Sequence, residues 1–555
     1  MQNLSAKLGK KRNYLIAVIS GTLLTLSFPP LPFYLLAFVA FVPLLFVISD
    51  DQVKHKYLLI YITFFIYHTG SNWWISSWSK ETDPFLLISG LVLDFFHPLF
   101  FLFPFWLFFI IKKHKGKNFA LVLFPFIFVS FEWLHSLGDL SYPWLTVGYT
   151  QMSNLFWIQF IDITGIYGSS FLILIANVII LKLIYLKIET QTSNFFKLIL
   201  NSKKGMQYVI ILVLIIFLPF FYTFTIIQKY DYYTNLKAGK NTNIGIVQPN
   251  INPWAKWTES TTGQIEKHFN ISDSLIKSSS NIDLLIWSET AIPYVYLDFN
   301  SLQDLSLITN WIKKENVSLL TGIAEFYLVP KGNTPPKWAK QFVFDSSQYY
   351  LTFNSAILLN PNSMRADTAR PFTYRKTRLT PFAENFPLKD VIPFAVKWLM
   401  WGVGISNWNV GDGPQLLQVN NESKKYKIGP IICIESIYPN YVRHFTLQGA
   451  QILTVITNDG WYDHTVGPTQ HFIIAAARAI ENRRYLARVA NTGISGFISP
   501  FGTTLKELPQ YKSIGTTMLL PLLSDKTIYV IYGDWLAYIS AIISFIAIVY
   551  SLIRK

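Results

Sequence analysis

Long apolar segments constrain this chain more than any other feature of its sequence. The apolar residues are crowded into about the first 230 positions and roughly the last 25. A helix needs about 20 such residues to cross the hydrocarbon core of a bilayer, because each residue adds only about 1.5 Å. Only 14% of the 555 residues are charged, whereas an ordinary soluble domain has about 25%. We therefore expect an integral membrane protein with a soluble part between its membrane segments.

The apolar segments predict an α-helical bundle of about eight membrane spans, of which the first three are short. The expected spans are Tyr14–Pro29, Leu31–Ile48, Tyr57–Thr69, Phe85–Ile111, Phe119–Leu134, Trp157–Leu181, Tyr208–Ile227 and Trp535–Ile553.

Basic clusters beside these segments predict the orientation in the membrane. Short cytoplasmic loops hold an excess of Lys and Arg, and five clusters fall on one side of the eight-span arrangement, together with both termini. Membrane topology and anionic headgroups then explain the net charge of +15, and we expect no nucleic-acid partner because the clusters form no single stripe. The clusters are Lys7–Arg12, Lys54 with Lys56, Lys112–Lys117, Lys182–Lys204, and Arg554 with Lys555.

The central part of the chain has the composition of a soluble domain. Short β-rich runs alternate there with helical patterns, which predicts an α/β domain with a layered core. We expect three parts, namely 1–228 with about seven spans, 229–532 outside the cytoplasm, and 533–555 as the final span. The expected strands are Asn243–Gln248, Ile282–Trp287, Val317–Gly322, Asn354–Leu359, Lys427–Ile434, Ile452–Thr457 and Gly496–Ser499, and two expected helices are Thr261–Lys277 and Thr469–Arg484.

The chain contains one cysteine, Cys433, so an internal disulfide and a multi-cysteine metal site are both excluded. It follows the apolar run Lys427–Ile432, at the point where a buried strand is expected to end and the chain to turn. Many free cysteines are buried and inert. This run alone is therefore consistent with either a nucleophile or a structural residue.

A cysteine nucleophile needs a base or a positive charge nearby, and two segments supply candidates. Glu289 follows the strand expected over Ile282–Trp287, at the carboxyl end where functional groups of α/β sheets gather. Lys376 is followed eight residues later by Glu384. Taken singly, each of these charged residues is also consistent with an exposed loop.

Taken together and in this order, these runs resemble the Glu, Lys and Cys segments of the nitrilase superfamily, and most of all its apolipoprotein N-acyltransferase branch. That branch joins an eight-span bundle to a periplasmic nitrilase-like domain, so the resemblance covers nearly the whole chain. Two departures are Ser288, where the family often has proline, and Ile434, where it often has an aromatic residue. The matching runs are Trp287-Ser288-Glu289, Tyr374-Arg375-Lys376, Pro381-Phe382-Ala383-Glu384, Cys433-Ile434-Glu435, Val247 to Ile251, Lys256-Trp257, Thr457 to Trp461 and Gln470 to Gly493.

The resemblance implies a fold and a set of roles. The fold is an α-helical transmembrane bundle plus an α/β nitrilase-like domain of four αββα layers, in the bacterial inner membrane with the catalytic domain periplasmic. Glu289 is implied as the general base for Cys433, and Lys376 as the oxyanion donor together with the backbone N–H of Ile434. Further implied residues are Glu384 and Glu435, which support the site, and Trp257 and Trp461, which lie beside it.

The implied reaction moves an acyl chain from a phospholipid, with phosphatidylethanolamine as the expected donor, through a thioester on Cys433. The acceptor is the α-amine of a diacylglyceryl-cysteine apolipoprotein. No cofactor or metal is expected, and the protein is expected to act as a monomer in contact with membrane lipid. Two alternatives stay open from the residues themselves: a membrane-tethered carbon-nitrogen hydrolase, and a transporter or scaffold whose outer domain only binds.

Three further expectations concern residues outside these motifs. Asp94 and His97 stand one helical turn apart in the fourth span and are expected to bond to each other. His444 and His471 match no motif and are interpreted as structural. The apolar run Val391–Trp401 is expected to dip into the outer leaflet as a mobile arm, with Trp398 and Trp401 contacting lipid, although core packing is the competing explanation.

Overall fold

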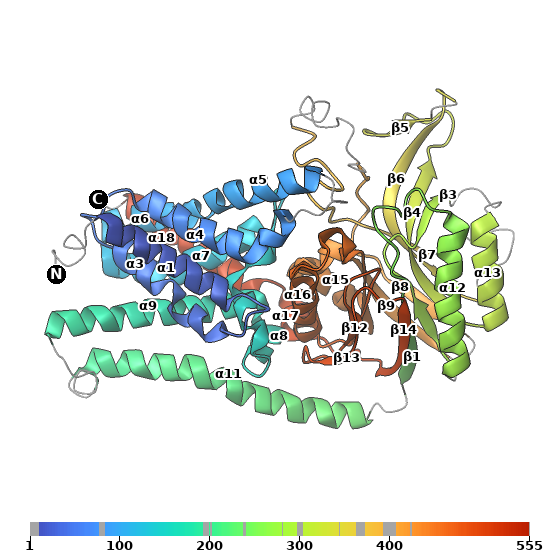
Figure 1. Ribbon diagram of the computed structural model, residues 1–555. Coiled ribbons are helices and arrows are strands. Elements are labelled where there is room, and N and C mark those ends of the chain that lie inside the picture. The colour runs from blue at the N-terminus through green and yellow to red at the C-terminus, as the bar shows by residue number, and fades with distance from the viewer. Residues whose placement is uncertain are drawn as a thin grey trace. The chain divides into compact units, whose positions relative to one another are not determined.

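The chain divides into two compact units (Figure 1). One comprises Met1–Trp78, Pro84–Tyr230 and Tyr532–Lys555, and the other Ser79–Asp83 and Asp231–Ile531. We call them the helical unit and the two-sheet unit. The computed structural model describes residues 10–76, 84–191, 199, 202–236, 240–279, 281–296, 303–342, 345–361, 372–391, 407–421 and 424–553.

The helical unit is helical in all eight segments that the hydropathy pattern predicts. Five helices in the described part of the chain are long and apolar enough to cross a membrane: Leu87–Lys115, Lys117–His135, Ile166–Thr190, Lys203–Gln228 and Trp535–Ile553. The elements are α1 (Lys10–Ser27), η1 (Tyr34–Leu36), α2 (Ala37–Ala40), α3 (Val42–Ile48), α4 (Lys56–Asn72), η2 (Trp73–Ser76), α5 (Pro84–Phe100), α6 (Leu102–Lys115), α7 (Lys117–His135), η3 (Pro143–Leu145), η4 (Val147–Ser153), η5 (Ile158–Phe160), α8 (Ile161–Thr164), α9 (Ile166–Thr190), α11 (Lys203–Leu236) and α18 (Trp535–Ile553).

Two glycines allow α1 and α4 to pack closely. A Cβ on Gly21 would lie 2.5 Å from the carbonyl oxygen of Thr63, and a Cβ on Gly70 would lie 2.4 Å from Thr25. Small residues at such contacts let helix backbones approach within a bilayer. Because the contacts advance along both helices in the same direction, α1 and α4 run parallel, and the basic start of α1 lies at the same end of the unit as Lys56.

Ionic contacts join further basic residues at that end. Lys112, near the end of α6, pairs with Asp51 at 2.5 Å, and Lys56 at the start of α4 lies 3.8 Å from the same carboxylate. These contacts place the predicted clusters on α4 and α6 side by side.

Cation–π contacts extend this group to the later helices. The ammonium of Lys115 lies 4.2 Å from the ring centroid of Tyr550 near the end of α18, and that of Lys117 lies 3.9 Å from the ring of Tyr185 on α9. The basic residues around α4, α6 and α7 thus gather at one end of the helical unit, beside the ends of α9 and α18.

The predicted bond between Asp94 and His97 is wrong. His97 Nδ1 lies 2.5 Å from His68 Nε2, and His97 Nε2 lies 2.6 Å from His135 Nε2. Spacing along one helix could not reveal this arrangement, because the partners stand on α4 and α7. The three rings link α4, α5 and α7.

The two-sheet unit contains two β-sheets. In the described residues, the first has the strand order β14-β1-β2-β4-β6-β5, with β3 paired to β4 and β7 to β6, and the second has the order β13-β12-β11-β10-β9-β8. The strands are β1 (Asn241–Gln248), β2 (Leu284–Ile286), β3 (Ile292–Tyr296), β4 (Ser318–Leu328), β5 (Lys340–Gln341), β6 (Tyr349–Leu359), β7 (Phe372–Arg375), β8 (Leu417–Asn420), β9 (Lys425–Ile432), β10 (Ile452–Thr457), β11 (Leu486–Ala490), β12 (Ser495–Ile498), β13 (Thr504–Leu508) and β14 (Ile514–Pro521).

Helices cover the outer face of each sheet, which gives four layers (Figure 1). α12 (Thr261–Ser278) and α13 (Gln303–Glu315) pack on the first sheet around a core that includes Trp287, Ile312 and Leu319. α15 (Pro439–Gln448) and α16 (Gly467–Asn482) pack on the second sheet, and the short α17 (Ile528–Tyr532) follows. The prediction of a helical bundle together with an α/β nitrilase-like domain of αββα layers is confirmed.

Both sheets have a parallel centre. β1, β2 and β4 run parallel in the first sheet, and β9, β10 and β11 in the second. Their apolar, β-branched sequences suit strands that are covered on both faces. Residues that follow these strands therefore meet at the carboxyl edge of each sheet.

Candidate active site

Two of the predicted site residues lie in the turns that follow parallel strands. Glu289 follows β2 by three residues, and Cys433 follows β9 directly. The backbone near Glu289 approaches β4 so closely that a Cβ on Gly322 would lie 2.4 Å from the nitrogen of Thr290. Only glycine fits there, and the contact fixes the height of Glu289 above the sheet edge.

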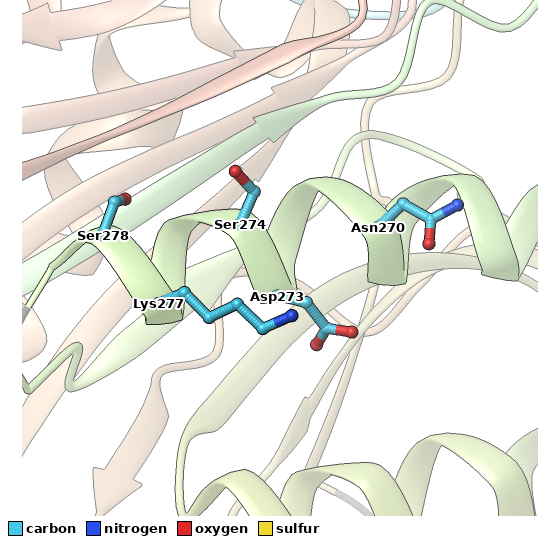
Figure 2. Close-up of a pocket in the computed structure, with 5 residues that line it drawn as sticks. All are labelled: Asn270, Asp273, Ser274, Lys277 and Ser278. Atoms are coloured by element: carbon cyan, nitrogen blue, oxygen red, sulfur yellow. The ribbon is translucent and has the colours of Figure 1, made fainter.

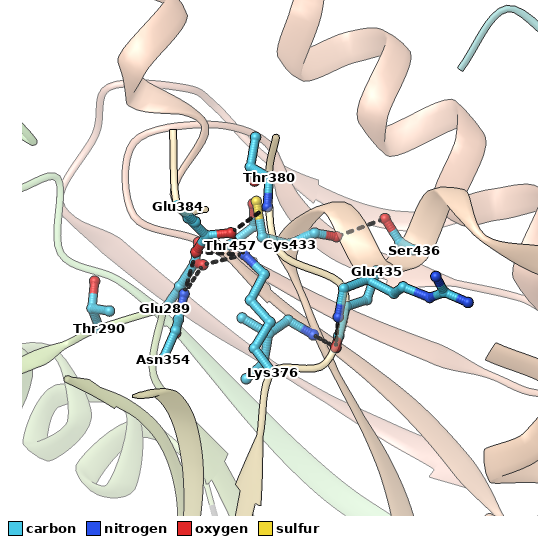
Figure 3. Close-up of polar contacts among 12 residues, drawn as sticks. Glu289, Thr290, Asn354, Lys376, Thr380, Glu384, Cys433, Glu435, Ser436 and Thr457 are labelled. Carbon is cyan, nitrogen blue, oxygen red and sulfur yellow. Dashed lines mark hydrogen bonds and ion pairs between the residues drawn. The ribbon is translucent and has the colours of Figure 1, made fainter. Parts of the chain in front are cut away.

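Lys376 lies between two carboxylates, as Figure 3 shows. Its Nζ is 3.2 Å from Glu289 Oε1 and 2.7 Å from Glu384 Oε2. Asn354 on β6 donates to both carboxylates from Nδ2, at 2.7 Å to Glu289 and 2.9 Å to Glu384. The loop after β7 is held to Glu384 by the backbone N–H of Thr380 at 2.8 Å. The four side chains form one buried hydrogen-bonded cluster.

The charges in this cluster support one another. Burial opposes the charge on Lys376, but Glu384 and Glu289 outweigh it and hold the pKa of the ammonium above its ordinary value. Burial would raise the pKa of Glu384, yet the Lys376 charge lowers it. A buried ammonium with two carboxylate partners therefore stays charged.

The Cys433 thiol stands beside this cluster in Figure 3. Burial raises the pKa of the thiol, and the charge of Glu289 raises it further, while Lys376 acts in the opposite direction. The resting side chain is therefore a thiol and not a thiolate. It becomes a nucleophile only when a base removes its proton.

Glu435 ties the cysteine turn to the lysine loop. Its carboxylate accepts hydrogen bonds from the backbone N–H of Ile432 at 2.9 Å and of Thr377 at 2.7 Å. It also accepts a bond from the Tyr374 hydroxyl at 2.7 Å. One fully buried side chain thus joins the end of β9 on the second sheet to the residues after β7 on the first.

Cys433 itself adopts a left-handed backbone conformation, with φ of 51°. This conformation is unusual for a residue with a Cβ and persists where the surroundings enforce it. The chain turns there from β9 into η6 (Cys433–Ile437). The predicted strand to Ile434 therefore ends two residues early, because the turn begins at the cysteine.

A second buried ionic group lies under this turn. Asp459 follows β10 and accepts from Arg488 at 2.9 Å, while His471 Nδ1 lies 2.9 Å from the same carboxylate. His471 Nε2 lies 2.8 Å from the Ser436 hydroxyl and 3.2 Å from the carbonyl oxygen of Cys433. The interpretation of His471 as a structural residue did not include this contact with the cysteine turn.

Lys256 is another buried residue that the sequence reasoning did not use for the site. Its Nζ donates to the carbonyl oxygen of Glu289 at 3.0 Å and to the hydroxyl of Thr290 at 2.7 Å. Burial lowers the pKa of Lys256 to about 7, although the Glu289 charge opposes this. Its position directly before Trp257, in a run already matched to the family, was the available signal.

Among the four predicted substrate-binding tryptophans, the two in the described part of the chain pack against different rings. Trp257 packs edge-on against Tyr294 at 5.6 Å between ring centroids, and Trp461 packs against Trp254 at 4.9 Å. Trp398 and Trp401 lie outside the described residues, as does all of the predicted arm except Val391.

A surface depression on α12 is separate from this site. Figure 2 shows its lining side chains, which all come from that one helix. None of the residues around Cys433 lines it, and its one carboxylate, that of Asp273, accepts a hydrogen bond from Trp311 at 2.8 Å. In the described part of the chain, no group of three or more His, Cys, Asp or Glu is placed to hold a metal ion. The lining residues are Asn270, Asp273, Ser274, Lys277 and Ser278.

Two family models match this chain, one almost entirely within the helical unit and one within the two-sheet unit. Residues 20–179 match the model of the apolipoprotein N-acyltransferase N-terminal domain, and residues 243–519 match the carbon-nitrogen hydrolase model. A solved structure, that of Saccharomyces cerevisiae Nit3, a member of branch 10 of the nitrilase superfamily, covers 53% of this chain and 93% of its own at 14% identity and a TM-score of 0.36. These values are too low to add to the assignment.

Curated relatives match almost the whole length. A protein of Chlorobaculum tepidum named apolipoprotein N-acyltransferase is 30% identical over 98% of this chain and 97% of its own. A Rickettsia prowazekii protein of the same name is 30% identical over 95% of this chain and 96% of its own. A third, from Geobacter metallireducens, is 27% identical over 95% and 93%. The chain belongs to the apolipoprotein N-acyltransferase family.

Proposed function

We propose that this membrane enzyme transfers an acyl chain from a phospholipid, through a thioester on Cys433, to the N-terminal amine of an apolipoprotein. Family membership supports the overall reaction. The observation that carries the assignment to this site is the buried Lys376, held between Glu289 and Glu384 beside a thiol that is protonated at rest. A cation fixed beside a nucleophile can stabilise an oxyanion without reorganising during the reaction.

In the first half-reaction, Glu289 removes the proton from the Cys433 thiol. The sulfur attacks the ester carbonyl carbon of the phospholipid, and the carbonyl oxygen becomes an oxyanion that Lys376 and the backbone N–H of Ile434 stabilise. The intermediate then collapses with cleavage of the carbon–oxygen bond. The departing alkoxide takes the proton from Glu289 and leaves as a lysophospholipid.

In the second half-reaction, the free α-amine of the acceptor attacks the thioester carbonyl. The same donors stabilise the second oxyanion, and Glu289 removes a proton from the attacking nitrogen. Cleavage of the carbon–sulfur bond forms the amide, and Glu289 returns the proton to the Cys433 sulfur. The cycle ends with the thiol restored and needs no external oxidant or cofactor.

Glu384 and Glu435 act as positioning residues in this proposal. Glu384 shares the Lys376 ammonium with Glu289 and is fixed by the N–H of Thr380. Glu435 keeps the cysteine turn and the lysine loop in register through backbone hydrogen bonds. Neither needs to touch the substrate. Trp257 and Trp461, together with Trp398 and Trp401, remain candidates for contacts with the acyl chain or the acceptor.

We infer that phosphatidylethanolamine is the donor and a diacylglyceryl-cysteine apolipoprotein the acceptor, and that the enzyme acts as a monomer in a bacterial inner membrane. The proposed parts are a bundle over 1–228, a periplasmic catalytic domain over 229–532 and a final span over 533–555. The gathering of basic residues at one end of the helical unit supports cytoplasmic termini, because the positive-inside rule assigns such an end to the cytoplasm.

Intact-mass measurement of the purified enzyme tests the proposed reaction. With phosphatidylethanolamine and no acceptor, we expect one acyl chain on Cys433, released by hydroxylamine or by a diacylglyceryl lipopeptide and absent from Cys433→Ala. Steady release of free fatty acid without an acceptor would indicate a hydrolase instead. Full transfer activity in Cys433→Ala would remove the cysteine from the mechanism.

Reporter fusions test the orientation independently. Alkaline phosphatase fused after Lys240 should be active, since that enzyme needs an oxidising compartment for its disulfides. A fusion within the Lys112–Lys117 cluster is the matched control and should be inactive. The reverse pattern would overturn both the assigned compartment and the cytoplasmic termini.

A further inference from the structure

The carbonyl oxygen of Cys433 belongs to the same peptide group as the N–H of Ile434. Two side chains reach this oxygen, since the Ser436 hydroxyl donates to it at 2.9 Å (Figure 3) and His471 Nε2 lies 3.2 Å away. A hydrogen bond to the oxygen of a peptide group strengthens the donor at its nitrogen, because hydrogen bonds in a chain polarise one another. Whatever binds this oxygen therefore influences the proposed oxyanion donor.

The contacts of the His471 ring favour a proton on each of its two nitrogens. Nδ1 faces the Asp459 carboxylate at 2.9 Å and must carry a proton to bond with it. Ser436 has one hydroxyl proton, which it donates to the Cys433 carbonyl. If Nε2 had no proton, its lone pair would face both that carbonyl oxygen and the lone pairs of Ser436. A ring with protons on both nitrogens lets Ser436 keep its bond to this carbonyl, whereas a neutral ring would draw the Ser436 proton to Nε2 and leave the carbonyl oxygen without that donor.

We propose that His471 is an imidazolium that polarises the Cys433–Ile434 peptide and so strengthens the Ile434 N–H as an oxyanion donor. This inference rests on the proposed function, because it concerns the oxyanions of both half-reactions. His471 acts through the peptide group and does not touch the substrate. It is a positioning residue on the second sheet's side of the site.

The surroundings of the ring can hold its positive charge. The His471 and Asp459 side chains are only 5% and 6% exposed. Burial would raise the pKa of Asp459, but Arg488 and His471 lower it to about 2, so the carboxylate stays ionised. Asp459 also accepts from the Thr457 hydroxyl at 2.8 Å. An ion pair with its remaining lone pairs hydrogen-bonded is the arrangement that buried charges require.

Isotope-edited infrared spectroscopy of the acyl-enzyme, in which Cys433 carries the acyl chain as a thioester, tests the polarisation directly. The full-length protein would be acylated on Cys433 by phosphatidylethanolamine that carries ¹³C at its acyl carbonyls. The thioester band would be identified by its loss with hydroxylamine. In His471→Gln, whose side-chain amide offers a neutral donor near the Nε2 position, we expect the carbonyl stretch to move to higher frequency. A thioester carbonyl that meets a weaker donor keeps more double-bond character.

Rates provide a second readout. Acylation of Cys433 by phospholipid (charging) and transfer of the acyl chain to the lipopeptide should both slow on the order of 10-fold in His471→Gln. This is less than the ~100-fold or more that loss of a whole oxyanion donor costs. The KM for phospholipid should stay unchanged, because the ring does not bind the donor. His444→Gln on α15 is the matched control, since its ring bonds to the backbone of its own helix at Asn440, and it should change neither rate nor spectrum.

A second variant keeps the inference testable if His471→Gln does not fold. Asp459→Asn keeps the shape of the side chain but removes the anion that stabilises the ring charge, and should shift the band and the two rates in the same direction. An unmoved carbonyl band in a folded variant, or a wild-type charging rate, would overturn the inference. Absence of any Cys433 adduct in the wild type would instead show that the proposed function has failed.

Discussion

The two sheets contribute carboxylates that differ in what they bind. On the first sheet's side, Glu289 and Glu384 bind a side-chain ammonium, that of Lys376, whose charge is available to a reacting oxygen. On the second sheet's side, Glu435 binds backbone N–H groups, and Asp459 binds other buried side chains. In the proposed mechanism, the first pair controls charge and proton movement, whereas the second pair controls where the nucleophile is held. This difference predicts that mutations on the first sheet's side mainly slow the reaction, whereas mutations on the second sheet's side also lower the stability of the fold.

The largest effect should come from Lys376→Met. Charging of Cys433 should slow by about 10² to 10³, as for the loss of one oxyanion donor, with little change in phospholipid KM. Intact-mass time courses measure this. Lys340→Met is the matched control, because Lys340 donates to Thr352 on the same sheet at 3.0 Å and has no role in the cluster. Equal slowing in both variants would contradict the comparison.

Glu435→Gln should affect both properties. The new amide would turn a donor toward backbone N–H groups that now meet a carboxylate, at a cost of about 1–3 kcal/mol. We expect a lower melting temperature together with slower charging, because the cysteine turn and the lysine loop lose their common support. Differential scanning fluorimetry in detergent and the mass assay provide the two readouts. Slower charging at an unchanged melting temperature would indicate that Glu435 acts in the chemistry, as Glu289 and Glu384 are proposed to do, and not in holding the turn.

Glu384→Gln should slow charging on the order of 10-fold, since Lys376 loses one charged partner but keeps Glu289. The pH dependence has a definite sign. The Lys376 charge lowers the pKa of Glu384, so its contribution to stability is present above about pH 4.5 and is lost as the pH falls through the folded-state pKa. The melting temperature of Glu384→Gln should therefore fall less on acidification than that of the wild type. Glu266→Gln, at an exposed position on α12, should behave like the wild type.

Lys256→Met should have the smallest effect, and we expect it as a change in how stability depends on pH above about 7. The folded-state pKa of Lys256 is lowered from 10.5 to about 7, so the unfolded chain binds more protons between these values. Stability of the wild type should then rise as the pH increases from about 7 towards 10. The methionine variant should lack this rise in a melting series. An identical rise in both proteins would show that Lys256 is charged in the folded state.

Much of the fold could be predicted because its signals are local. β10 occupies Ile452–Thr457 as expected, and Glu289 and Cys433 follow strands whose apolar runs are plain in the sequence. The strand directly before Lys376, β7, was not expected, because a run of only four residues gives a weak periodic signal. Its place is set by pairing with β6, a contact between distant positions.

The residues that were missed depend on the same kind of distant contact. Asn354 bridges Glu289 and Glu384 from the middle of a strand, where an asparagine gives no local sign of a role. His471 reaches the cysteine turn from a helix that begins more than thirty positions later in the chain. A motif match records residues near a known nucleophile in sequence, whereas the support of a turn can come from any element packed beneath it.

The raised pKa of Cys433 has a consequence for the lifetime of the enzyme. Oxidants and disulfides attack the thiolate far more readily than the thiol. In the proposed mechanism, Cys433 keeps its proton until Glu289 removes it during turnover, so between turnovers the side chain reacts slowly with oxidants. In the oxidising periplasm proposed for this domain, the same burial that makes the nucleophile depend on a base would also preserve it from sulfenic acid and from mixed disulfides.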